Sequence, residues 1–120
     1  MRRAFLALLL TTALSACASR AAGAQTYSGT WDWSFETSSF VTDEGRGPWW
    51  LSAEGSSWDQ LVAPLQRSGG GPWGRVHVTV EATISEPGHY GHLGAYEREI
   101  RVTRVIESRL ISASRPPSGS

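Results

Sequence analysis

Residues 75–84, RVHVTVEATI, constrain the fold more than any other stretch, because apolar and polar side chains alternate along all of it. Successive side chains of a β-strand point to opposite faces of a sheet, so this alternation predicts a strand with one buried face. The outward face would include His77 and Glu81. The expected buried residues are Val76, Val78, Val80, Ala82 and Ile84.

Residues 29–41 also alternate and predict a long first strand. Trp31, Trp33 and Phe35 would share its buried face. Phe40 falls out of phase with these three residues, so we expect a bend or a bulge just before it.

Two shorter segments complete the expected strands. Residues 49–53, WWLSA, predict a strand that follows a glycine- and proline-containing turn at 42–48. Residues 96–106 predict the last strand, and we expect a bulge near Thr103 or Arg104 because the apolar alternation breaks there.

The stretch SSWDQLVAPLQ has helical spacing instead. Ser57 is a suitable N-cap, and Pro64 removes a backbone donor, so we expect a helix of at most two turns. Its apolar face, with spacing i, i+3, i+4 and i+7, would comprise Trp58, Leu61, Val62 and Leu65.

The order strand, strand, short helix, strand, strand predicts a mainly β fold, a small OB-like β-barrel of four to five strands. The fifth strand depends on whether the bent first strand counts twice. In OB folds, ligands meet the loops that join strands 1 and 2 and strands 4 and 5. We assign these two loops to 42–48 and 86–95.

Composition limits the classes of partner. All eleven basic residues are arginines, and without Arg2 and Arg3 nine remain against eleven acidic residues, a net charge of −2. Nucleic-acid binders usually carry a basic patch, whereas the charges here are interleaved, so we expect no nucleic-acid partner. The six tryptophans, all between Trp31 and Trp73, are the more unusual feature.

The beginning of the chain has the layout of a secretory signal. Arg2 and Arg3 precede an apolar run from 4 to 14 that is too short to span a bilayer. The run leads into Leu-Ser-Ala-Cys at 14–17, which resembles a bacterial lipobox and implies that Cys17 is acylated, with palmitate among its chains. Ala18, rather than Asp, implies the outer membrane and its periplasmic face.

An alternative cleavage site is the Ala-x-Ala sequence at 22–24. Cleavage after Ala24 would leave a soluble periplasmic protein. We therefore expect a lipoprotein signal peptide at 1–16, followed by three segments. These segments would be a lipidated Cys and tether at 17–26, an OB-like β domain at 27–111 and a disordered tail at 112–120.

Three stretches, FETSSF, WWLS and VTVEATISEPGHYGHLGAYEREIRVTRVIESR, resemble a family of small bacterial envelope proteins. The most specific part is the Gly-His-Leu-Gly-x-Tyr turn at 91–96 between two strands. The resemblance implies an OB-like domain attached to a lipoprotein anchor, and no particular activity. Relatives often carry a Pro-Cys pair where this chain has Val41-Thr42, so a role for that cysteine is absent here.

Aromatic rings beside arginine suit sugar rings, peptides or stacked bases. We therefore take residues in or beside the expected loops as candidate ligand contacts. These are Arg46, Trp50, Trp73, His89, Tyr90 and His92. Three of the other four tryptophans, among Trp31, Trp33, Trp49 and Trp58, are expected in the core.

The segment 85–99 contains two of the three histidines. We expect an ordered connection in which Gly91 and Gly94 allow positive φ or close backbone approach. Leu93 and Tyr96 would pack it onto the barrel. The ring of His92 would donate to a neighbouring backbone carbonyl.

A metal-dependent activity at His89 and His92 is an alternative, but two histidines are fewer ligands than a metal needs, so we expect no metal site and no cofactor. The chain has no G-x-S-x-G elbow, and we expect no catalytic residues. Glu36 is expected to bond a backbone turn or pair with an arginine.

These features favour a lipid-anchored cell-envelope protein with a non-catalytic binding or scaffolding role. Its partners would be the membrane, through Cys17, and an envelope protein or cell-wall component. The alternative within the same fold is a small-ligand or glycan-binding module that uses 42–48 and 86–95.

Replacing Cys17 with Ser should move the protein from the membrane to the soluble periplasm, because Cys17 is the chain's only thiol and therefore the only acceptor for the lipid. Fractionation of cells that express either form, followed by immunoblotting, measures this. A Cys17→Ser protein that stays with the membrane would refute the lipobox interpretation.

Overall fold

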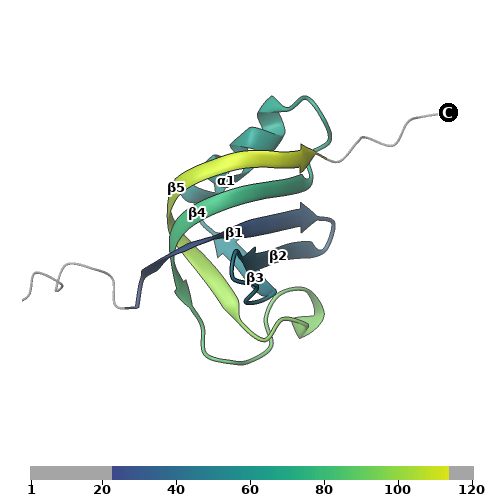
Figure 1. Cartoon of the computed structure of the whole chain (residues 1–120). Coiled ribbons are helices and arrows are strands. Elements are labelled where there is room, and N and C mark those ends of the chain that lie inside the picture. The colour runs from purple at the N-terminus through teal and green to yellow at the C-terminus, as the bar shows by residue number, and fades with distance from the viewer. Residues whose placement is uncertain (1–22, 114–120) are drawn as a thin grey trace, which may run out of the picture.

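The computed structural model describes residues 23–113, which form five β-strands and one α-helix (Figure 1). The elements are β1 (Gln25–Ser34), β2 (Thr37–Thr42), β3 (Trp49–Ala53), α1 (Ser56–Arg67), β4 (Gly74–Ile84), the 3-10 turn η2 (His92–Gly94) and β5 (Glu99–Ala113). The predicted signal peptide and Cys17 lie outside the described residues. The outermost strand residues, 25–26 and 112–113, fall where the tether and the tail were expected.

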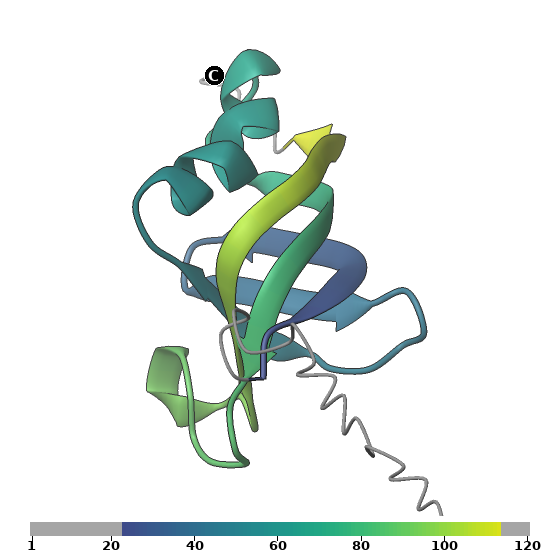
Figure 2. The ribbon, with the colours of Figure 1, turned by 90° about the vertical axis from the view of Figure 1, so that its left-hand side faces the viewer.

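The strands pair in the order β1-β2-β3-β5-β4, and β4 pairs back with β1 to complete a circuit. β3 and β5 run parallel, whereas the other neighbours are antiparallel. The helix α1 connects β3 to β4 and lies against β5 and β4 (Figure 2). This arrangement confirms the predicted mainly β fold with five strands and one helix, and its element order is the one expected of an OB-like fold.

The predicted long first strand is a hairpin of two strands. β1 ends at Ser34 and β2 begins at Thr37, with Trp31 opposite Phe40 in the register. The bend is therefore a tight turn at Phe35 and Glu36, earlier than expected, with Glu36 at φ 63°. Phe35 is 71% exposed and does not share the buried face of Trp31, which corrects that prediction.

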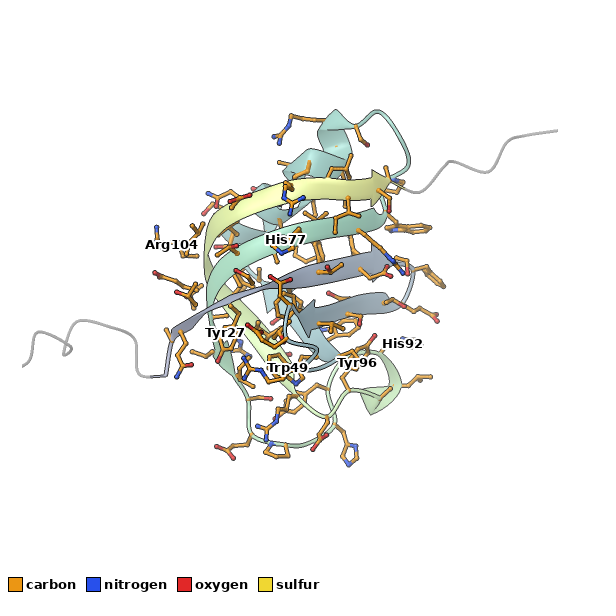
Figure 3. All side chains as sticks on the ribbon, in the orientation of Figure 1. Tyr27, Trp49, His77, His92, Tyr96 and Arg104 are labelled. Atoms are coloured by element: carbon orange, nitrogen blue, oxygen red, sulfur yellow. The ribbon has the colours of Figure 1, made fainter. Side chains whose placement is uncertain are left out.

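The alternating segment forms β4, as predicted. Val76, Val78, Val80 and Ala82 are all fully buried, and each buried valine side chain contributes on the order of 1.5–3 kcal/mol to folding. His77 faces the other way, with its Nε2 3.2 Å from the carboxylate oxygens of Asp43 (Figure 3). The core that β4 faces also contains Trp31, Phe40, Leu51, Leu61, Leu65 and Ile100.

The helix is longer than predicted. α1 has 12 residues, more than three turns, and its N-cap is Gly55 rather than Ser57. Pro64 lies inside it and is buried. The helix continues past the missing donor because tertiary burial of Leu61 and Leu65 outweighs the loss of one backbone hydrogen bond.

β5 begins later than predicted and runs to Ala113. Its register with β4 skips Thr103, between the pairs Glu81–Arg104 and Ala82–Val102, which confirms the predicted bulge. On the outer face, Arg104 donates a hydrogen bond to Glu81 at 3.1 Å. This bond and the charge of the carboxylate raise the pKa of Arg104 above its ordinary value.

A buried chain of two hydrogen bonds connects three strands. The indole Nε1 of Trp31 on β1 donates to Oγ of Ser38 on β2 at 2.9 Å, and this hydroxyl donates to the carbonyl of Leu51 on β3 at 2.7 Å. The β2–β3 register contains only two pairs, the last being Ser39 with Trp50. The Ser38 side chain therefore holds β2 to β3 next to the point where their register ends.

Ser38→Ala should destabilise the fold by about 1–3 kcal/mol, because it removes the acceptor of the Trp31 indole in a buried place. Urea unfolding followed by circular dichroism measures the loss. Ser39→Ala, at the adjacent and less buried position, is the control and should change stability by less than about 0.5 kcal/mol. Equal, small losses for both variants would show that the hydrogen-bond chain does not stabilise the fold.

Candidate functional site

Two connections meet at one end of β2. The β1–β2 turn contains Glu36, and the β4–β5 connection, 85–98, contains His92. Nε2 of His92 lies 3.2 Å from Oε2 of Glu36, and both side chains are partly exposed. The structure thus pairs His92 with a carboxylate rather than a backbone carbonyl, and pairs Glu36 with a histidine rather than an arginine or a backbone turn.

The β4–β5 connection packs on Trp50 of β3. Gly91 has φ 72°, and a Cβ atom there would clash with the indole of Trp50. Tyr96 contacts the same indole, with ring centroids 5.2 Å apart at 66°. The predicted roles of Gly91 and Tyr96 are therefore confirmed, whereas Leu93 is 89% exposed and does not pack on the barrel.

Backbone and side-chain hydrogen bonds order this connection. Tyr90 and Tyr96 exchange backbone hydrogen bonds of 2.9 and 3.1 Å. The hydroxyl of Tyr90 donates to the carbonyl of Glu86 at 2.9 Å, and the backbone of Gly88 donates to Glu97 at 2.8 Å. These hydrogen bonds fix the conformation of the connection and therefore the positions from which Gly91 and Tyr96 contact Trp50.

The candidate ligand contacts do not form one site. Because β1 and β2 are separate strands, 42–48 joins β2 to β3 and lies at the opposite end of β2 from the Glu36 turn. There, the guanidinium of Arg46 lies 5.9 Å from the ring centroid of Tyr27 and 5.6 Å from that of Trp49. The assignment of 42–48 as the loop that joins strands 1 and 2 was therefore wrong.

The other candidates are spread over β3, the segment before β4 and the β4–β5 connection. Trp73 is 37% exposed and lies beside Phe35, with ring centroids 6.4 Å apart. His89 is exposed, next to Gly94 and not beside the carboxylate that His92 contacts. Of the six candidates, Trp50 is the one that lines the pocket described next.

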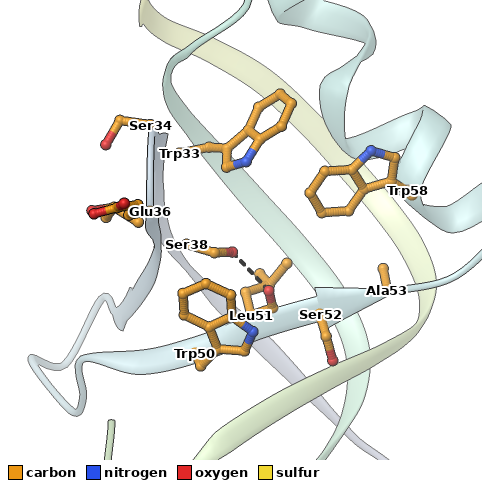
Figure 4. Close-up of a pocket in the computed structure, with 10 residues that line it drawn as sticks. Trp33, Ser34, Glu36, Ser38, Trp50, Leu51, Ser52, Ala53 and Trp58 are labelled. Carbon is orange, nitrogen blue, oxygen red and sulfur yellow. Dashed lines mark hydrogen bonds between the residues drawn. The ribbon is translucent and has the colours of Figure 1, made fainter. Parts of the chain in front are cut away.

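A pocket of about 240 Å³ opens where β2 and β3 diverge (Figure 4). Indole rings border it from three sides, and hydroxyl groups and one carboxylate complete its lining. The residues are Trp33, Ser34, Glu36, Thr37, Ser38, Trp50, Leu51, Ser52, Ala53 and Trp58. We call it the tryptophan pocket.

The walls of the tryptophan pocket are fixed by packing. Trp33 stacks on the fully buried Trp31, with centroids 5.5 Å apart and an interplanar angle of 14°. Trp58, from the first turns of α1, meets Trp33 at 88° with centroids 5.1 Å apart. The hydrogen bond from Ser38 to Leu51 lies beside them (Figure 4).

Among the tryptophans expected in the core, Trp31 is fully buried, and the others are partly buried and pack against the core. Trp33 and Trp58 therefore have two roles, because they also line the pocket. The sequence interpretation missed both as ligand contacts. The sequence feature that could have indicated this role is their position, beside the hairpin turn and at the start of the helix.

The tryptophan pocket has a single ionisable lining residue, and it is acidic. Glu36 contributes a carboxylate, and no arginine is among the lining residues.

Among residues 23–113, no three His, Cys, Asp or Glu side chains gather closely enough to hold a metal ion. Within the same range, no helix has the length and apolar character to cross a membrane.

No protein-family model, curated protein or solved structure matches this chain. The resemblance to envelope lipoproteins therefore stays a prediction.

Gly91→Ala should lower stability by about 2–5 kcal/mol and red-shift tryptophan emission, because a Cβ atom costs about 1–2 kcal/mol at this positive φ and about 1–3 kcal/mol more by forcing the connection away from Trp50. Gly45→Ala is the matched control: Gly45 has φ 90° with nothing within 4 Å, so this variant reports the backbone cost alone, about 1–2 kcal/mol. Equal losses with unchanged emission would contradict the described packing.

Proposed function

We propose that this protein is a non-catalytic binding module of the bacterial cell envelope, anchored by lipid on Cys17, with the tryptophan pocket as its ligand site. The observation that carries the proposal is the pocket itself: three indole rings around about 240 Å³, at the end of the barrel where two connections converge. Concave, largely aromatic sites with a few polar groups are typical of ligand binding.

The polar groups at the pocket favour binding over catalysis. A nucleophilic mechanism needs a hydroxyl or thiol bonded to a base that a third group orients. Here the buried hydroxyl of Ser38 donates to a backbone carbonyl, and His92 contacts the carboxylate of Glu36. The hydrogen bond joins β2 to β3, and the His92–Glu36 contact joins two connections, so both have a structural role.

The position of β1 supports an envelope role close to a membrane. Residues 18–24 separate Cys17 from the first strand residue, Gln25, and an extended chain of that length spans at most about 25 Å. A lipid on Cys17 would therefore keep the domain at the membrane surface. Cleavage after Ala24 remains the alternative, and it would leave β1 at the start of a soluble periplasmic protein.

The partner that fits this proposal is a component of the envelope, either a protein or a cell-wall fragment. The negative charge at the pocket and the net charge of −2 after signal removal disfavour nucleic acid and other polyanions. The resemblance of 91–96 to envelope proteins supports the same placement.

A photo-reactive residue at position 34, on the pocket lining, should give a discrete adduct in the envelope fraction of irradiated cells. The same residue at position 112, an exposed place on β5, is the control and should give none. Intact-protein mass spectrometry and immunoblotting detect small and large adducts. Identical patterns at both positions, or no adduct at position 34, would refute a ligand site in the pocket.

A further inference from the structure

We infer that the tryptophan pocket takes an organic cation, a compact alkylated or quaternary ammonium group. The inference rests on the proposed function, because it names the ligand class of the same pocket. Three properties of the pocket support it: the angles between its walls, the sign of its charge and its size.

The walls form a corner rather than a platform. Trp33 and Trp58 meet at 88°, and Trp50 borders the pocket from a third side (Figure 4). Perpendicular aromatic walls surround a compact group, and indole is the best side chain for attracting a cation over its face. A sugar ring binds best to one flat, open aromatic face, but Trp33 is backed by Trp31 and abutted by Trp58.

The charge favours a cation. Glu36 is the one ionisable residue in the lining, and its partner His92 is not among the lining residues. The lining contains no arginine that could bind phosphate or carboxylate. An ammonium group would therefore gain from both the indole rings and the carboxylate.

The size matches a small head group. A dry cavity of about 150 Å³ holds a molecule the size of benzene. The tryptophan pocket, at about 240 Å³, has room for an ammonium group with three methyl substituents and a short tail. The hydroxyls of Ser34 and Ser52 lie in the lining, where they could bond a polar tail.

Choline and its neutral isostere 3,3-dimethyl-1-butanol test this inference, because they share shape and hydroxyl group but differ in charge. The mature lipidated protein, which begins at Cys17, would be held in a polyoxyethylene detergent, which has neither an ammonium nor a sugar group. Tryptophan fluorescence titration at constant ionic strength measures Kd. We expect choline to bind at least about tenfold more tightly than the isostere.

Two variants locate the effect. Glu36→Gln keeps the size of the side chain and an oxygen atom beside His92 but removes the charge, and should weaken choline binding about three- to tenfold without changing binding of the isostere. Glu44→Gln, in the exposed 42–48 connection at the other end of β2, should leave both affinities unchanged.

Tighter binding of N-acetylglucosamine than of choline, or equal binding of choline and the isostere, would overturn the cation inference and leave the binding function in place. Saturable binding of none of the three probes would overturn the inference as well. The crosslinking experiment at position 34 would then decide separately whether the binding function fails too.

Discussion

The hydrogen bonds from Trp31 to Ser38 and from Ser38 to Leu51 are the interaction on which the rest of the structure depends. They connect β1, β2 and β3 next to the point where the two-pair register of β2 with β3 ends. Beyond the last backbone pair, the Ser38 side chain connects the strands in place of backbone hydrogen bonds. The strands can therefore separate without leaving buried polar groups unpaired. The tryptophan pocket occupies the space between the strands, and the same Trp31 indole supports Trp33 as one of its walls.

The opposite wall depends on a distant part of the chain. Trp50 is held by the β4–β5 connection, through the close approach of Gly91 and the ring of Tyr96. The contact between His92 and Glu36 joins this connection to the β1–β2 turn. Such a partly exposed contact contributes on the order of 0–1 kcal/mol, so its role is to fix the relative position of the two connections rather than to stabilise the whole fold.

The sequence patterns predicted correctly the features that depend on the facing of residues within one strand. The alternation in β4 predicted its buried face, and the phase change predicted the bulge at Thr103, because both follow from which side of a strand each residue faces. The bend in the first strand was expected too late in the sequence, because neither Phe35 nor Glu36 is the glycine or asparagine that usually marks positive φ. The pocket was missed because it depends on where β2 separates from β3, which is a property of long-range pairing that no single segment encodes.

The most direct test of the central claim, that the tryptophan pocket binds an organic cation, is nuclear magnetic resonance of the six indole N–H groups during titration with choline. The account predicts that the largest chemical-shift changes occur at Trp33, Trp50 and Trp58, which line the pocket. Trp31, whose indole donates to a buried hydroxyl, should change little. Changes confined to Trp73, or no change at any indole group, would contradict the claim.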